Sequence, residues 1–387
     1  MKVLYFAQES SGGLLPYAQD QADALGRHGA EVTVLCAPDF QKRHGDAYEL
    51  LPRLVSSKTA TRSNRLVRRL RFANRYLRNA SVLASETARG NFDAVLLSSY
   101  AEYLAPLWAE RFCRLDRQGT LFGAIIQEPV RDFVVGPLWW HRWSVRRAYD
   151  YLSLAFTHDE VDLDTCGSKT RPDHYVIPYG PHRFPDARRS REEVRRELDV
   201  PIGAPLLFSF GLVRDGKNLD YTIKALREIP EAYFLVAGRR NAAGQKPESY
   251  YIELARKLGV ENRCRWKFQF ISEEEAADLF TASDLVMLTY SSDFRSASAA
   301  LNVAVRYRRP VVASAGQGSM QSAVRNYKLG IWVEPDNASA ACEGIKEWLR
   351  NPFEPNWDSY NEKNSWDRNA RIVLDAFQEA RRVKRVA

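Results

Sequence analysis

Residues 206–218 read LLFSFGLVRDGKN and contain a strand, a turn and the start of a helix. The first five residues form a nearly continuous apolar run, which is typical of a parallel strand covered on both faces. In the turn, Gly211 precedes two cations three residues apart, Arg214 and Lys217. A forked guanidinium, an ammonium and a helix N-terminus at one strand end can together bind phosphate. The alternative is a solvated basic turn, and composition alone does not decide between the two.

The same alternation of apolar runs and amphipathic stretches extends in both directions from this turn. Predicted strands after residue 200 are Leu206–Phe210, Tyr233–Ala237, Arg265–Phe270, Asp284–Thr289, Pro310–Ala313 and Gly330–Val333. Predicted strands before it are Lys2–Ala7, Glu31–Cys36, Phe92–Ser98, Thr120–Ile126, Tyr151–Thr157 and His174–Pro178. Repeated strand–helix–strand units predict an α/β fold with two Rossmann-like, doubly wound parallel sheets facing a central cleft. Ligands of such sheets bind outside the carboxyl ends of the strands.

The division between the two halves is predicted at the segment IPYGP (residues 177–181), which is followed by a charged stretch over residues 183–197. We therefore expect one domain over residues 1–180 and a second over residues 181–364. The last residues, 365–387, form a separate amphipathic helix.

Composition narrows the classes of protein. Of 387 residues, 45% are apolar and 27% charged, and the net charge is +8. This composition excludes a disordered or fibrous chain, and the positive excess favours anionic partners.

The sequence contains no run of about 18 apolar residues, so no membrane span is predicted. The five cysteines form no CxxC pair and the histidines no HxxxH pair, so we expect reduced thiols and no metal site. The opening residues form a strand rather than a signal peptide, and we expect a cytoplasmic protein.

A second candidate phosphate site is the stretch YSSDFRSASAAL (residues 290–301). Small residues from Ser296 to Ala300 open a predicted helix and would let a phosphate approach its first amides. The alternative is an ordinary serine-capped helix packed on its sheet.

The turn after the first strand contains Gly12 and Gly13. It lacks the third glycine of GxGxxG and the acidic ribose ligand, so a dinucleotide-binding fold is poorly supported. The two glycines either let a substrate lie against the backbone or form a plain tight turn.

A basic run extends from Arg53 to Arg78, with nine Lys/Arg and no acid, and Leu66, Leu70, Ala73 and Leu77 form a stripe within it. Such a helix suits an anionic membrane surface, where Trp139, Trp140 and Trp143 would add aromatic anchors. The alternative is a solvated face over a normal core stripe. No nucleic-acid-binding motif accompanies the charge.

Further stretches have the order and spacing of one known family. SGG (11–13) through GAEVTV (29–34) is similar to its N-terminal loop, helix and strand, FGLVRDGKNL (210–219) to its donor-phosphate turn, and PVVAS (310–314) to the strand after its donor helix. Along nearly its whole length the chain resembles the family 4 glycosyltransferases of the GT-B fold. In that fold the last helix, here opened by Ser365-Trp366, crosses back to the first, acceptor-side domain.

The resemblance implies a role for each candidate residue. Arg214 and Lys217 would bind the diphosphate of a nucleotide sugar, and Gln127 and Glu128 would approach the sugar; these four are the implied catalytic residues. The other donor-binding positions that it implies are Gly12, Gly13, Gly211, Gly238, Arg239, Phe270, Ile271, Ser298, Ala299 and Ala300. The nucleotide sugar is a co-substrate, and neither a cofactor nor a metal is implied.

Three positions depart from the family pattern. Retaining members usually carry two glutamates eight residues apart at the donor helix, and Arg295 and Val303 occupy those positions here. The family's sugar-contacting histidine is replaced by Gln127, which can hydrogen-bond a sugar but cannot become cationic.

We therefore expect a metal-independent, retaining glycosyltransferase that transfers a sugar to a glycan or lipid-linked acceptor. The expected setting is surface polysaccharide or glycolipid synthesis, peripheral on the cytoplasmic face of a membrane. The alternative, supported by Arg295, Val303 and Gln127, is a catalytically impaired nucleotide-sugar-binding or scaffold protein. A nucleotide-sugar epimerase is a third hypothesis.

Overall fold

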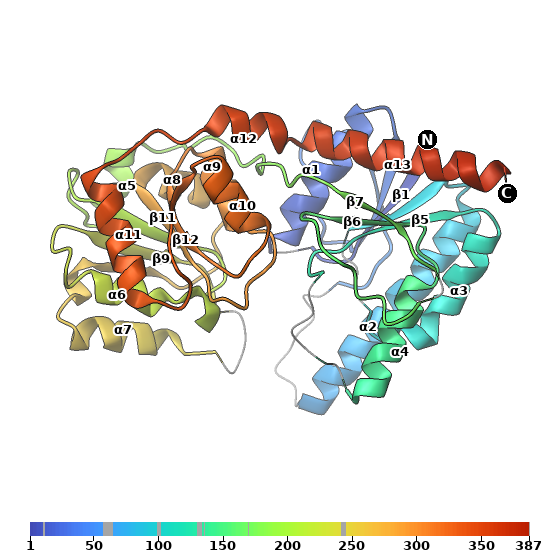
Figure 1. Ribbon diagram of the computed structural model, residues 1–387, viewed down its shortest axis with the longest axis horizontal. Helices are drawn as coiled ribbons and strands as arrows, with labels where there is room; N and C mark the ends of the chain where they lie inside the picture. The colour runs from blue at the N-terminus through green and yellow to red at the C-terminus, as the bar shows by residue number, and fades with distance from the viewer. Residues whose placement is uncertain are drawn as a thin grey trace. The chain divides into compact units, whose positions relative to one another are not determined.

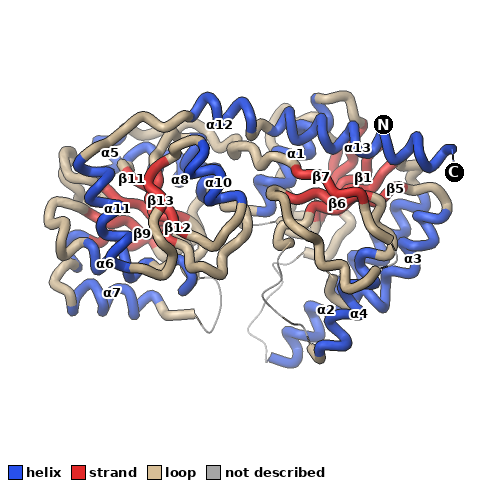
Figure 2. Tube along the Cα trace, in the orientation of Figure 1, coloured by secondary structure: helices blue, strands red, loops and turns tan. Residues whose placement is uncertain are grey.

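The computed structural model describes residues 1–10, 12–56, 65–98, 102–129, 134, 136–168, 170–240 and 245–386. The chain forms two compact units: unit 1 consists of Met1–Gly180 and Asn364–Ala387, and unit 2 of Pro181–Lys363 (Figure 1). Each unit is a parallel sheet with helices on both sides (Figure 2). Residues 57–64 of the predicted basic run, and Ser11 of the SGG stretch, lie outside the described residues.

The sheet of unit 1 has seven strands in the order β3-β2-β1-β4-β5-β6-β7. They are β1 (Lys2–Ala7), β2 (Glu31–Cys36), β3 (Glu49–Pro52), β4 (Ala94–Leu97), β5 (Leu121–Ile125), β6 (Leu154–Thr157) and β7 (Asp173–Val176). Every pair is parallel, as the apolar runs predict. The strand order reverses direction between β1 and β4. The edge strand β3 gives no clear signal in the sequence because it has four residues and ends in proline.

The helices of unit 1 are α1 (Leu14–Arg27), α2 (Arg65–Arg89), α3 (Ala105–Arg117), α4 (Leu138–Tyr149) and α13 (Trp366–Val386). α13 lies beside α1, where Gln21 Nε2 donates to Asn369 Oδ1 at 2.8 Å (Figure 1). Further along α13, the buried Phe377 packs against Gly123 of β5. Sequence-distant apolar contacts thus hold the last helix on the first sheet. None of the described helices is long and apolar enough to cross a bilayer.

The sheet of unit 2 has six parallel strands in the order β10-β9-β8-β11-β12-β13, and its direction reverses between β8 and β11. They are β8 (Leu206–Phe210), β9 (Tyr233–Ala237), β10 (Cys264–Lys267), β11 (Leu285–Thr289), β12 (Val311–Ser314) and β13 (Gly330–Trp332). The helices are α5 (Arg191–Glu197), α6 (Leu219–Ala225), α7 (Glu248–Lys257), α8 (Glu273–Ala282), α9 (Ala299–Arg306), α10 (Ser319–Asn326), α11 (Ala338–Arg350) and α12 (Trp357–Lys363). Two apolar cores flank the sheet, one under α8 and α9 and one under α6 and α11.

The charged stretch over residues 183–197, predicted as part of the hinge, contains an anchor of unit 2. Arg195 of α5 is fully buried, its guanidinium pairs with Asp284 at 2.6 Å, and it donates to the carbonyls of Pro201, Ile202 and Ala204. A buried charge is tolerated only with such full pairing. This part of the predicted hinge is therefore fixed to the sheet of unit 2.

Candidate functional site

Two turns at the carboxyl ends of the strands of unit 2 have their backbones in contact. The turn after β8 begins at Gly211, whose φ of +93° favours glycine, and its amide donates to the carbonyl of Ala237 at 2.9 Å. The turn after β9 begins at Gly238, where an added Cβ would lie 1.9 Å from the carbonyl oxygen of Gly211. Both glycines are therefore required for the backbone to lie this close at the strand ends.

Lys217 lies buried beneath the first of these turns. It ends a short 3-10 helix (Asp215–Lys217), is 8% exposed, and its ammonium donates to the carbonyl of Phe210. Its own carbonyl accepts from Thr289 Oγ1 of β11 at 3.0 Å, across the reversal point of the sheet. Burial, together with the positive charge of Arg214, lowers the pKa of Lys217 to about 7. An ammonium in this position is poorly compensated, and an incoming anion would stabilise its charged form.

Arg214 is half-buried and lies over two aromatic rings. Its guanidinium carbon is 5.1 Å from the ring centroid of Phe294 and 5.6 Å from that of Tyr290, and the two rings stack at 4.2 Å. Cation–π contacts of this kind hold the planar fork in one orientation. Tyr290 OH in turn lies 3.2 Å from Ser298 Oγ. The aromatic pair therefore links Arg214 to the N-terminus of α9.

The N-terminus of α9 is where the sequence left two alternatives open. Ser298 caps the helix, since its buried Oγ accepts from the amide of Leu301 at 3.2 Å. The first two amides, at Ala299 and Ala300, precede the intrahelical hydrogen bonds and carry only methyl side chains. The serine-capped helix is thus present, and binding of a phosphate at its leading amides stays a prediction.

Asp336 forms hydrogen bonds to two turns of this site, and the sequence did not identify it. Its carboxylate accepts from the amide and the hydroxyl of Ser292, at 2.8 and 2.6 Å, and from Asn218 Nδ2 at 3.2 Å. Burial alone would raise the pKa of Asp336, but the bonds from Ser292 and Asn218 lower it below the usual value. Asp336 joins the turn after β8 to the turn after β11. It lies 44 residues from Ser292 in sequence, so no local pattern could reveal the pairing.

The remaining predicted donor residues of unit 2 lie at the same strand ends. Arg239 and Phe270 are exposed, the latter at 67%, and Ile271 is buried. At the two donor-helix positions that depart from the family pattern, Arg295 is exposed, whereas Val303 is buried in the core under α9. The valine is therefore a core residue in this chain.

The four predicted site residues of unit 1 follow β1 and β5. The carbonyls of Gly12 and Gly13 accept from the amides of Leu15 and Tyr17 at 3.3 and 3.4 Å, in the first turn of α1. Gln127 is half-buried, and its amide nitrogen is 3.5 Å from the carbonyl oxygen of Ser98, while Glu128 is exposed. These four residues form no hydrogen bonds with one another in the part of the chain that the structure describes.

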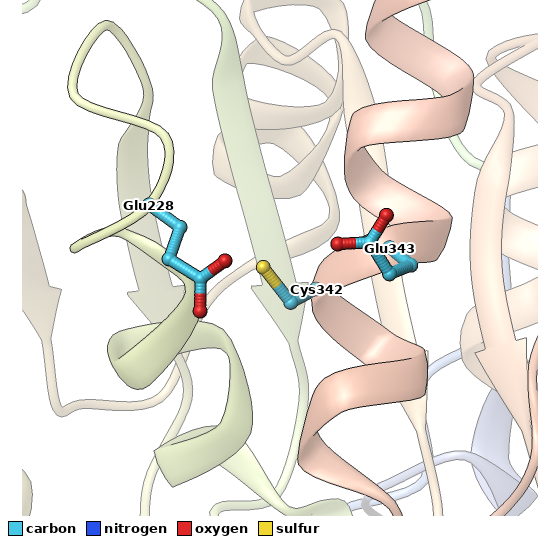
Figure 3. A group of neighbouring side chains, drawn as sticks. All are labelled: Glu228, Cys342 and Glu343. Atoms are coloured by element: carbon cyan, nitrogen blue, oxygen red, sulfur yellow. The ribbon is translucent and has the colours of Figure 1, made fainter.

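Among the residues that the structure describes, one cluster has side chains close enough to hold a metal ion. Figure 3 shows the thiol of Cys342 between the carboxylates of Glu228 and Glu343. The ammonium of Lys346 donates to Glu228 at 2.6 Å and to Glu343 at 2.9 Å. One lysine thus pairs with both carboxylates, so the cluster is an ion-pair network. The expected absence of a metal stays a prediction.

Residues 190–373, which span most of unit 2, match the family described as Glycosyl transferases group 1. This part of the chain is similar to that family. The chain is 26% identical over 175 residues to a D-inositol 3-phosphate glycosyltransferase of Corynebacterium aurimucosum, an alignment that covers 43% of this chain and 39% of the relative. The match thus spans less than half the length of that curated relative.

Solved structures show that this chain has the GT-B fold. A sucrose-phosphate synthase of Thermosynechococcus elongatus superposes with a TM-score of 0.71 at 17% identity, covering 98% of both chains. HepE of Anabaena, in complex with UDP, superposes with a TM-score of 0.68 at 14% identity, covering 98% of this chain and all of the other. The predicted resemblance and fold class are confirmed.

Proposed function

We propose that this protein is a retaining glycosyltransferase that uses a UDP-sugar as donor. The observation that carries the proposal is Lys217, buried at the reversal point of the unit 2 sheet beside Arg214, with its pKa lowered to about 7. A protein accepts the cost of burying such a cation where an anion compensates it. UDP is proposed as the nucleotide because the Anabaena structure holds it.

In the proposed reaction the bond between the sugar's anomeric carbon and the diphosphate oxygen breaks, and the acceptor hydroxyl oxygen bonds to that carbon. The electron pair of the broken bond leaves with UDP, and the acceptor's proton passes to the departing phosphate oxygen on the same face. Arg214, Lys217 and the leading amides of α9 stabilise the developing negative charge. Because two cations supply this stabilisation, the proposal includes no metal.

The proposed contacts to the nucleoside and to the sugar are assigned from the positions of the residues at the strand ends. Gly238, Arg239, Phe270 and Ile271 are proposed to face the nucleoside, with the exposed ring of Phe270 available for stacking on the base. From unit 1, Gln127 and Glu128 are proposed to contact the sugar, and Gly12 and Gly13 to line the path between sugar and phosphate.

The test is UDP affinity, measured by calorimetry, in Arg214→Ala and Lys217→Ala variants. Loss of one charge-assisted hydrogen bond costs about 1.5–3 kcal/mol, so each variant should bind UDP roughly 10- to 150-fold more weakly. Lys224→Ala is the matched control, since Lys224 is exposed on α6 and pairs with Asp220. Unchanged UDP affinity in the Arg214/Lys217 double variant would contradict the site.

A second candidate function is nucleotide-sugar binding without catalysis. It is favoured by the two departures at the donor helix, since Arg295 and Val303 leave that helix without the family's paired carboxylates. Turnover separates the two: release of UDP from a UDP-sugar in the presence of acceptor supports the transferase. Tight binding with no transfer, hydrolysis or epimerised product supports the binding protein.

We further propose that unit 1 binds an anionic membrane surface, as suits a lipid-linked acceptor. α3 contacts both α2 and α4, so the three helices form one layer. Leu70 of α2 is 62% exposed, and Trp139 and Trp143 of α4 are 65% and 45% exposed. The exposure of Leu70 disagrees with a buried stripe along α2 and supports the membrane hypothesis. Exposed aromatics next to cations are typical of interfacial helices.

Sedimentation with vesicles tests this proposal. Wild-type protein should sediment with phosphatidylglycerol-containing vesicles at low salt and less so at high salt, because screening weakens the attraction. The Trp139→Ala/Trp143→Ala variant should sediment less, while Phe353→Ala, which removes an exposed ring of unit 2, should not differ from wild type. Absence of binding at low salt would contradict the membrane proposal alone.

A further inference from the structure

Charged side chains gather at the amino ends of the strands of unit 2, at the opposite end from the proposed donor site. Two arginines of α5 reach this place, and a third arginine lies just before β12. Because Val286 of β11 pairs with Val311 of β12, the residues two positions earlier in the two segments lie side by side. None of the contacts proposed above uses them. The residues that we call the amino-end group are Arg191, Arg195, Asp284 and Arg309.

The carboxylate of the amino-end group, Asp284, already accepts from two arginines. Its Oδ1 accepts from Arg191 Nη2, and its Oδ2 accepts from Arg195 Nη2 at 2.6 Å and from the amide of Leu206 at 2.8 Å. Arg195 is fully buried and depends on this pairing. Both carboxylate oxygens are therefore in use, although Arg309 lies alongside them.

Arg309 is the unpaired cation of the group. Its guanidinium forms no hydrogen bond and no ion pair with the residues that the structure describes. At the end of α9 the carbonyl of Ala304 accepts from the backbone amide of Arg309 at 2.8 Å, and not from its side chain. Burial and the charges of Arg191 and Arg195 lower the pKa of Arg309, and the charge of Asp284 opposes them. An arginine in this field is stabilised by an added anion.

Solvent reaches the donors of this group. The side chain of Arg309 is half-buried, and of its three guanidinium nitrogens only Nε is both buried and without a partner. The two terminal nitrogens, which also form no hydrogen bond to the described residues, are thus in contact with solvent. Arg191 is 28% exposed, and its Nε forms no hydrogen bond in the same part of the chain. A ligand can therefore approach two guanidinium groups with unused N–H donors.

The charge balance at this end of the sheet is positive. Three arginines stand against Asp284 and the exposed Glu192, whose charge acts on Arg195. The residues of unit 2 that the structure leaves undescribed, 241–244, are Asn, Ala, Ala and Gly and add no charge. A phosphate group has about −1.5 to −2 charges at pH 7 and three acceptor oxygens, so it can accept from two guanidinium groups at once.

We propose that the amino-end group binds the phosphate group of a small molecule, with the terminal nitrogens of Arg309 and Nε of Arg191 donating to its oxygens. The site is separate from the proposed donor site, because the two lie at opposite ends of the strands of unit 2. This inference goes beyond the proposed glycosyl transfer and does not depend on it.

The test is binding of radiolabelled inorganic phosphate to the full chain by equilibrium dialysis. The Arg214→Ala/Lys217→Ala variant is the starting chain, so that phosphate at the proposed donor site is not counted. It should still bind about one phosphate per chain, and adding Arg309→Met should raise the Kd at least about tenfold through the loss of charge-assisted hydrogen bonds. Adding Arg308→Met instead should leave the Kd unchanged, since Arg308 is 57% exposed and pairs with Asp358.

Urea unfolding controls for folding and separates binding from a structural role. In chloride buffer, Arg309→Met should be at least as stable as wild type, because it keeps the apolar stem and removes an unpaired cation. Phosphate at the same ionic strength should raise the urea midpoint of wild type and of Arg308→Met, but not that of Arg309→Met. Acetate, with one charge and two oxygens, should raise the wild-type midpoint less than phosphate does.

Three results would overturn the inference. The first is the same phosphate Kd in the chains with Arg309→Met and Arg308→Met, and the second is an equal response of the wild-type midpoint to phosphate and acetate. The third is reduced sedimentation of Arg309→Met with anionic vesicles at an unchanged phosphate Kd, which would assign Arg309 to a membrane surface. Failure of the wild type to bind UDP would contradict the proposed function and leave this site untouched.

Discussion

Gly238 lies so close to Gly211 that a Cβ on Gly238 would stand 1.9 Å from the Gly211 carbonyl oxygen. The two glycines begin the turns after β9 and β8, and Arg214 and Lys217 of the proposed donor site lie in the turn after β8. The spacing between these two backbones therefore sets where Arg214 and Lys217 lie.

Replacing Gly238 with alanine should disturb this spacing. The methyl group must displace backbone, and the φ of +149° is also unfavourable for alanine, so we expect a loss of about 1–3 kcal/mol in the free energy of unfolding. UDP affinity should fall at the same time. The matched control is Gly203→Ala, because a Cβ there meets nothing within 4 Å. Equal stability and UDP affinity in the two variants, by urea unfolding and calorimetry, would contradict the role given to Gly238.

The lowered pKa of Lys217 makes stability depend on pH in a known direction. Its pKa falls from an ordinary value of 10.5 to about 7 on folding, so between these values the unfolded chain binds more protons than the folded one. The contribution of Lys217 to the free energy of unfolding therefore rises with pH across this window and is least favourable below pH 7. Lys217→Met should be more stable than wild type at pH 6, and the difference should shrink towards pH 10. If the unfolding free energies of wild type and Lys217→Met changed with pH in parallel, Lys217 would not be a buried, titrating ammonium.

Asp336 should stabilise the site through its charge. Asp336→Asn weakens the bonds from Ser292 and Asn218, so we expect a loss of about 1–3 kcal/mol in unfolding free energy at pH 7. Because folding lowers the pKa of Asp336, its contribution is present above the ordinary carboxyl pKa and is lost as pH falls through the lowered value. Urea unfolding at pH 7 measures the loss of stability in Asp336→Asn, and urea unfolding near pH 3 measures how far that loss has disappeared. Asp293→Asn, at an exposed aspartate of the same turn, should be neutral; a similar loss in both variants would assign the effect to general surface charge.

The packing of α13 on the first sheet should contribute strongly to stability. Phe377 is fully buried against Gly123, and Phe377→Ala should cost about 3–5 kcal/mol. Val383→Ala, at a position of the same helix that is 65% exposed, should cost little. If thermal unfolding gave the two variants the same stability, α13 would not be held by Phe377.

The sequence predicted the parts of the fold whose signals are local. The apolar run before Gly211, the helix after it and the small residues after Arg295 each lie within one short stretch, and both sheets were found from such runs. β3 was missed because a four-residue edge strand has too few positions to show a pattern. Some strands end a few residues away from the predicted positions. At β10 the predicted end was Phe270 and the observed end is Lys267, because the apolar residues continue past the last hydrogen bond between the strands.

The parts that could not be predicted depend on contacts between distant residues. Sequence identifies Lys217 as a cation, but burial and its lowered pKa follow from the packing of β8 against β11. Asp336 is unremarkable in sequence because its partners lie in two other turns. Arg75 belongs by composition to a basic surface helix, and only its pairing with Glu9 shows that it turns towards the sheet.

Proton-linked UDP binding tests the central claim most directly. An anion at Lys217 should raise its pKa, so binding at pH 8 should take up about one proton, seen in calorimetry as a heat that varies with the ionisation enthalpy of the buffer. Lys217→Met should bind UDP more weakly and take up no proton at that pH. Tight UDP binding by the wild type with no proton uptake at pH 8 would contradict the account, because the diphosphate would then not be held by the buried ammonium.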